Sequence, residues 1–201
     1  MRFHKIISTL FHPIVIPTIG IMTYFLITTK PIEYNQKRIT LVIIFGCTYI
    51  MPLLLLTILK VFKIINSIQL KSRKERKIPL AIMFFLFYGL GTLFHKIKIL
   101  EEVSLLFYAT SLGLLITYLF LNLKIKSSIH LLSMGLTCGF FMLITFINNE
   151  SYLLIVILSI LISGLVATSR LHLKAHTEKE IYLGFFIGIC AIFGLYFFYN
   201  I

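Results

Sequence analysis

The chain has 201 residues, of which 59% are hydrophobic and only 13% are charged, and its formal net charge is +12. Soluble domains are usually about 25% charged, so this composition excludes an ordinary soluble domain. The long apolar runs indicate an integral membrane protein, because about 20 apolar residues cross the hydrocarbon as a helix. The basic residues lie between those runs, which argues against nucleic acid as a partner and favours membrane topology or an anionic ligand.

Seven apolar runs predict an all-α bundle of membrane-spanning helices, at residues 11–28, 39–62, 78–94, 103–123, 131–147, 152–168 and 181–199. The third run is among the shortest, so six or seven spans are expected. In the first run, His12 with Pro13 and Pro17 is interpreted as an irregular entry rather than part of a site. Pro52 predicts a kink in the second run. No repeat or linker divides the chain, which predicts one membrane-embedded domain over residues 1–201.

Short breaks between the runs make neighbouring spans antiparallel, so seven crossings place residues 1–10, 63–77, 124–130 and 169–180 on one face. This face carries thirteen of the nineteen lysines and arginines. The positive-inside rule therefore predicts that the N-terminus and this face are cytoplasmic. Three polar clusters, residues 71–79, 125–130 and 169–180, are expected to meet there.

The third cluster contains a histidine and a glutamate at helical spacing. On a helix, His176 and Glu180 share one face. The carboxylate can then fix the imidazole tautomer and leave the other ring nitrogen free as nucleophile or base. The planar guanidinium of Arg170 matches phosphate oxygens. This combination predicts phosphoryl transfer through a phosphohistidine.

The other two clusters supply complementary chemistry. The Ser128 hydroxyl can hydrogen-bond a phosphate oxygen, and His130 can protonate a departing alkoxide. In the basic run, Lys71 and Arg76 are the candidate phosphate-binding cations, although positive charge near anionic headgroups explains the run equally well. Pro79 is expected in the first turn of the following helix.

The three clusters resemble the motifs of the type-2 phosphatidic acid phosphatase superfamily. In its third motif, Ser-Arg is followed by five residues, His, three residues and Asp. Here Ser169 and Arg170, His176 and Glu180 keep that spacing, with Glu in place of Asp. Ser128 and His130 match two positions of the second motif, Pro-Ser-Gly-His. The basic run stands at the first motif in a different register.

The resemblance covers about residues 71–188 and implies a motif-bearing core at about 63–200. It implies a metal-independent, cofactor-free phosphatase acting on a lipid phosphate or polyprenyl diphosphate, in the cytoplasmic membrane of a bacterium. His176 is then the nucleophile, Glu180 orients it and His130 is the acid. The implied phosphate-binding residues are Arg170, Ser128, Ser169, Arg76 and Lys71.

The alternative is a non-enzymatic protein of the same fold that binds or transports an anion or lipid. The apolar runs contain few ionisable residues, which disfavours a conducting path. Pairs of small residues, Gly135–Gly139, Gly184–Gly188 and Ser159–Ser163, predict close helix contacts in the last three spans. The sequence leaves the oligomeric state and the particular lipid open.

Overall fold

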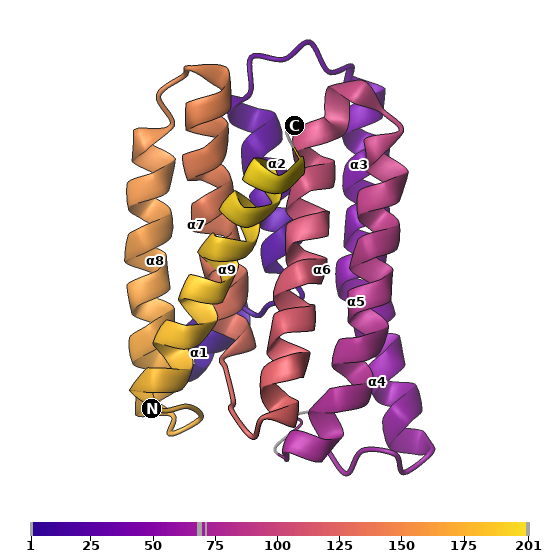
Figure 1. Cartoon of the computed structure of the whole chain (residues 1–201), viewed down its shortest axis with the longest axis vertical. Coiled ribbons are helices and arrows are strands. Elements are labelled where there is room, and N and C mark those ends of the chain that lie inside the picture. Colours follow the sequence, from indigo (N-terminus) through magenta and orange to yellow (C-terminus); the bar gives the residue numbers. More distant parts are fainter. Residues whose placement is uncertain (1, 68–69, 71, 200–201) are drawn as a thin grey trace.

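The computed structural model describes residues 2–67, 70 and 72–199, and they form a bundle of long helices (Figure 1). The described residues contain no strand, so the predicted all-α fold is confirmed. In chain order the helices are α1 (Arg2–Leu10), α2 (Ile16–Ile27), α3 (Tyr34–Phe45), a π-helix (Gly46–Ile50), α4 (Met51–Val61), α5 (Arg73–His95), a short 3-10 helix (Lys98–Leu100), α6 (Glu101–Asn122), α7 (Ile129–Asn148), α8 (Leu153–His172) and α9 (Glu178–Tyr199).

Six helical segments in the described part of the chain are long and apolar enough to cross a membrane. They are Tyr34–Val61, Arg73–His95, Lys98–Asn122, Ile129–Asn148, Leu153–His172 and Glu178–Phe198. Large apolar side chains such as Val42, Phe85 and Phe186 are exposed on their outer faces. Such a surface suits lipid rather than water, as expected for an integral membrane protein.

The predicted first span is shorter than expected. The helix begins at Ile16, and its 12 residues rise only about 18 Å, against about 30 Å of hydrocarbon. Pro13 and Pro17 explain the late start, because proline lacks the N–H that a helix interior requires. The preceding residues form a separate helix, α1, which buries Ser8 and exposes Phe3 and Ile6. This arrangement is typical of a helix that lies in the membrane interface.

The predicted kink at Pro52 takes the form of a wide turn. The amide of Met51 donates to the carbonyl of Gly46, five residues back, and closes a π-helix. Proline has no N–H and crowds the preceding turn, and a π-bulge accommodates both effects. The segment from Tyr34 to Val61 therefore stays continuous as one span.

Helix α5 begins earlier than predicted, which changes the position of Arg76. Ser72 accepts a hydrogen bond from the Glu75 amide, and Glu75 accepts one from the Ser72 amide, forming a capping box. This box starts the helix at Arg73, so the expectation that Pro79 lies in the first turn is wrong. Arg76 consequently projects from the helix rather than from a loop.

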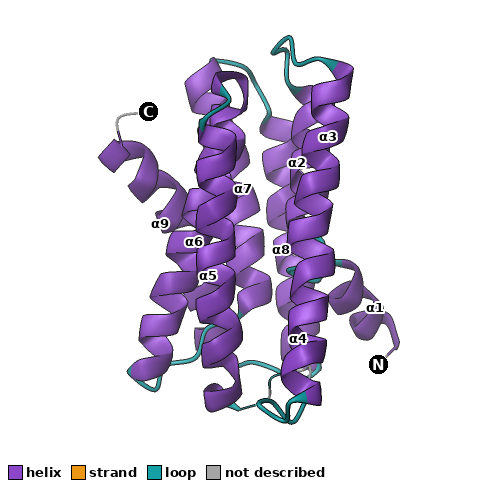
Figure 2. Cartoon of the chain, turned by 90° about the vertical axis from the view of Figure 1, so that its right-hand side faces the viewer, coloured by secondary structure: helices purple, strands orange, loops and turns teal. Residues whose placement is uncertain are grey.

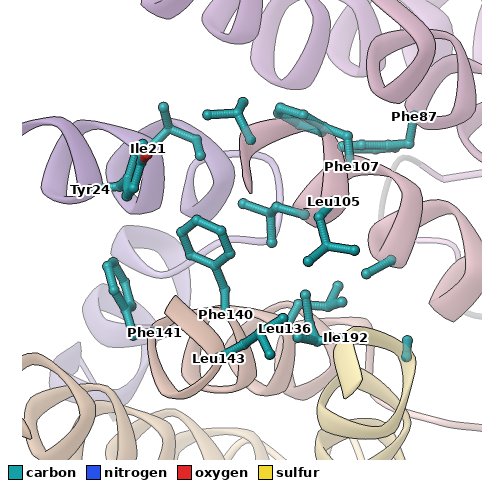
Figure 3. Packing of buried hydrophobic residues seen from close by; sticks show 14 of the residues in the cluster. Ile21, Tyr24, Phe87, Leu105, Phe107, Leu136, Phe140, Phe141, Leu143 and Ile192 are labelled. Carbon is teal, nitrogen blue, oxygen red and sulfur yellow. The ribbon is translucent and has the colours of Figure 1, made fainter. Parts of the chain in front are cut away.

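The buried core lies between α2, α6, α7 and α9. Figure 3 shows Tyr24 of α2, Phe107 of α6, Phe140 of α7 and Ile192 of α9 within this core, and all four side chains are almost fully buried. Helix α9 crosses α7 obliquely and its C-terminal end leans out of the bundle (Figures 1 and 2). Helix α7 is the most buried of the spans, so a residue at its start lies against several other elements.

The predicted close contact of glycine-containing helices is present between α7 and α9. A Cβ atom on Gly135 would lie 2.1 Å from the Phe185 carbonyl oxygen, and one on Gly188 would lie 2.5 Å from the Leu132 oxygen. Only glycine permits such an approach of two backbones. These contacts bring the start of α7 against the start of α9, where the second and third polar clusters lie.

Substitution Gly188→Ala is expected to destabilise the protein by about 1–3 kcal/mol, because the added methyl group must push α7 and α9 apart. Thermal unfolding followed by circular dichroism in detergent measures the change. Gly164→Ala is the matched control, since a Cβ there meets nothing within 4 Å. Equal loss of stability in the two variants would contradict a specific contact at Gly188.

Candidate active site

The three polar clusters meet at one end of the bundle. In Figure 1 α1, the end of α4, the start of α5 and the links α6–α7 and α8–α9 all lie in the lower part of the view. A cavity of about 1120 Å³ extends into the bundle from this end. Its charged or titratable lining residues are Lys5, His12, Arg76, Lys126, His130, Arg170, Lys174 and His176.

His176 is held in one orientation by Glu180. The His176 side chain is 3% exposed, and its Nδ1 lies 2.7 Å from Oε2 of Glu180. An ionised carboxylate only accepts hydrogen bonds, so Nδ1 carries the proton and Nε2 is the nitrogen with a free lone pair. The pair is not on one helix face as predicted, because α9 begins at Glu178 and His176 lies in the preceding link.

The start of α9 explains how glutamate serves at this position. The Thr177 hydroxyl accepts from the Glu180 amide, and the Glu180 carboxylate accepts from the Thr177 amide, both at 3.4 Å. This reciprocal pair has the pattern of a capping box, in which a glutamate side chain reaches back to the N-cap residue. The same carboxylate oxygen therefore caps the helix and binds the His176 ring.

Burial and neighbouring charges keep the His176 imidazole neutral. Burial lowers the pKa of His176 from its ordinary value of 6.5, the hydrogen bond that the ring donates to Glu180 raises it, and the cations Arg170 and Arg76 lower it. The net direction is downward. A neutral ring at neutral pH retains the lone pair that a nucleophile or base requires.

Replacing Glu180 by glutamine is expected to lower the His176 pKa further, because the substitution removes the group that favours the imidazolium. Arg76→Gln is expected to raise the same pKa, because a repelling cation is lost. Titration of the His176 ring by NMR measures both midpoints. A wild-type midpoint at or above 6.5, or no movement in either variant, would contradict this electrostatic description.

Two arginines, Arg170 and Arg76, line the cavity with their guanidinium groups. Arg170, on the last turn of α8, donates from Nη1 to the Ser8 hydroxyl at 2.8 Å, while its buried Nε has no partner among the described residues. Arg76 donates from Nε to the Leu70 carbonyl at 2.9 Å. The two guanidinium groups interact repulsively with each other. In the described part of the chain neither forms an ion pair with a carboxylate, so an anion between them would relieve that repulsion.

His130 lies at the start of α7 and faces the same cavity. Its Nε2 lies 3.2 Å from the carbonyl oxygen of Ser8, which only accepts, so Nε2 donates. The His12 ring packs edge-on against it, with centroids 5.1 Å apart. His12 also lines the cavity, so it lies beside the predicted site residues and not only at the entry to the first span. His130 and His176 lie close enough to interact electrostatically.

Two further predicted residues, Ser169 and Ser128, do not line the cavity. Ser169 is buried and its hydroxyl lies 3.2 Å from Nδ1 of His4. Ser128 is fully buried, its hydroxyl has no partner among the described residues, and its amide donates to the Glu180 carbonyl at 2.9 Å. Ser128 thus links α7 to the first turn of α9. Lys71 lies outside the described residues.

Sequence reasoning missed the contribution of the N-terminal segment. Ser8 contacts both Arg170 and His130, through its hydroxyl and its carbonyl respectively. No spacing pattern connects Ser8 with residues more than 100 positions later. The amphipathic pattern of residues 2–10, which buries Ser8 on one face, is the signal that identifies α1 as a helix lying against the bundle.

Among the residues that the structure describes, no three His, Cys, Asp or Glu side chains are grouped to hold a metal ion. Comparison with protein-family models, with curated proteins and with solved structures finds no match. The geometry around His176 is therefore the feature of the molecule that points to a function.

Proposed function

We propose that the protein is a membrane phosphatase that removes phosphate from a lipid phosphate or polyprenyl diphosphate through a phosphohistidine. The observation that carries the proposal is the buried His176 ring. Glu180 holds its Nδ1 at 2.7 Å, and its environment lowers the pKa, so Nε2 is a free nucleophile at neutral pH. Two guanidinium groups, neither in an ion pair with a carboxylate among the described residues, line the same cavity.

In the first step, Nε2 of His176 attacks phosphorus and the bond from phosphorus to the lipid oxygen breaks. Arg170 and Arg76 stabilise the charge on the phosphoryl oxygens, which is the main contribution a protein makes to this transfer. The bound phosphate dianion favours the imidazolium form of His130, because an adjacent negative charge stabilises it. With Nε2 held by the Ser8 carbonyl, the departing lipid oxygen takes its proton from Nδ1 of His130. Glu180 stabilises the positive charge that develops on the His176 ring.

In the second step, water attacks phosphorus and the phosphorus–nitrogen bond breaks. His130, which is now neutral, takes a proton from that water. The products are inorganic phosphate and free His176, so the atoms and protons balance over the cycle. Because the excess of Lys and Arg lies at the end of the bundle that carries the cavity, we propose that this end is cytoplasmic, in a bacterial cytoplasmic membrane.

The test is phosphate release by the full-length protein in lipid nanodiscs with EDTA present. The panel contains phosphatidate, phosphatidylglycerol phosphate, a polyprenyl diphosphate and a lipid-linked sugar phosphate. Release from at least one of them, at a rate that EDTA does not change, is the expected result. Binding of these lipids without release from any of them would instead favour a non-enzymatic lipid-binding module.

A further inference from the structure

The cavity does not end at the cations. Along α7, its lining residues run from His130 through Ser133 and Thr137 to Phe140. Ten residues of helix correspond to about 15 Å, which is about half of the hydrocarbon thickness. Lining residues on α5 extend similarly, from Arg76 to Phe87. The cavity therefore reaches from the membrane surface to about the middle of the bilayer.

The deep part of the cavity has apolar walls. On α5, α6 and α7, every described lining residue beyond Arg76 and His130 is uncharged. The hydroxyl groups on these helices are used within their own helices: Ser133 donates to the His130 carbonyl, Thr137 to that of Ser133, and Thr110 to that of Leu106. A buried water needs two to four polar partners. These walls present few, so they suit neither a water column nor an ion path.

A buried glycine on α2 borders open space in the same cavity. Gly20 of α2 is buried and lines the cavity, yet a Cβ atom built on it meets nothing within 4 Å. A close-packed interior leaves few such voids. The volume of about 1120 Å³ also exceeds the roughly 300–1,000 Å³ of pockets for drug-sized ligands.

We infer that this cavity binds a hydrocarbon chain of a phosphate-bearing lipid inside the helix bundle, with the phosphate at the arginines and the chain running past Gly20 toward Phe87 and Phe140. The cations at the mouth complement a phosphate, and the apolar depth complements a chain. The position of the headgroup rests on the proposed function, whereas the chain site rests on the walls alone. Substrates would then be distinguished by chain length and bulk as well as by headgroup.

The test uses a long-chain alkyl phosphate with a photoreactive diazirine at its methyl end, added to the full-length protein in nanodiscs. Peptide mass spectrometry locates the label after illumination. We expect labelling near Met83 and Phe140 in the wild type. Gly20→Leu should reduce this labelling about tenfold, because its side chain displaces about two CH₂ groups of the chain. Gly20→Ala should reduce it less.

Gly164→Leu is the matched control, because Gly164 lies exposed on α8 and a Cβ there also meets open space. This control should label like the wild type. Circular dichroism verifies that each variant is folded. The inference would be overturned if the Gly20→Leu variant were labelled near Met83 and Phe140 as strongly as the wild type. It would also be overturned if the label in the wild type were confined to outward residues such as Phe186. Labelling needs no turnover, so an absence of phosphate release would count against the proposed function alone.

Discussion

Replacing His176 by alanine is expected to lower the rate of phosphate release by at least about 10⁴-fold, the loss typical of removing a covalent nucleophile. The physical reason is that no other described nitrogen near the cavity combines burial with a carboxylate on the far side of the ring. The substrate should still bind, because Arg76 and Arg170 remain. Release of inorganic phosphate under saturating substrate measures the change in kcat.

Trapping the phosphohistidine intermediate tests whether His176 is the residue that carries the phosphoryl group. Radiolabelled substrate mixed with wild-type protein and quenched in alkali should leave label on the peptide that contains His176, because a phosphorus–nitrogen bond survives alkali and breaks in acid. His176→Ala should carry no label. Glu180→Gln should carry less, because the ring loses the group that orients it and stabilises its positive charge.

His95→Ala is the matched histidine control. His95 is exposed at the opposite end of the bundle, and we expect the rate of release to be unchanged. Release that persists in His176→Ala, or label that remains on the protein without this residue, would remove His176 from its proposed role.

The third polar cluster is the part of the candidate site that can best be predicted from the sequence. The four-residue spacing of His176 and Glu180 correctly indicated that the two side chains meet, although the meeting occurs at a helix start rather than along a helix. A Thr-x-x-Glu pattern at residues 177–180 is itself a sequence signal for that start. The Ser-x-x-Glu pattern at residues 72–75 is the same signal, and it places Arg76 on the helix that follows.

The N-terminal part of the candidate site cannot be predicted from local sequence patterns. Ser8 and His12 join the cavity only because two prolines interrupt the first apolar run and α1 packs beside α8 (Figure 2). The interruption can be read from the sequence, but the direction in which the short helix turns depends on tertiary packing. Local patterns therefore predict the long spans, whereas the contacts of Arg170 and His130 with Ser8 depend on the whole bundle.

Replacing Arg170 by alanine is expected to reduce kcat/KM by about 10²–10³-fold, as for other single donors to a charged transition state. Lysine should restore little of this loss, because an ammonium group lacks the planar fork of a guanidinium. The guanidinium N–H groups of Arg170 that face the cavity, apart from the one donated to Ser8, are the donors that we assign to phosphate. Arg38→Ala is the matched control, since Arg38 bonds Asn35 near the opposite end of the bundle.

Ser8→Ala separates phosphate binding from a merely structural role of Arg170. If the arginine only held α1 in place, removing the Ser8 hydroxyl would break the same bond and cause the same loss. If the arginine binds phosphate, Ser8→Ala should cost only about 3- to 10-fold, the usual worth of one hydrogen bond, and should act mainly on KM. The double variant then measures the coupling between the two side chains. Equal losses in the two single variants would assign Arg170 to the fold and leave Arg76 as the remaining phosphate-binding arginine.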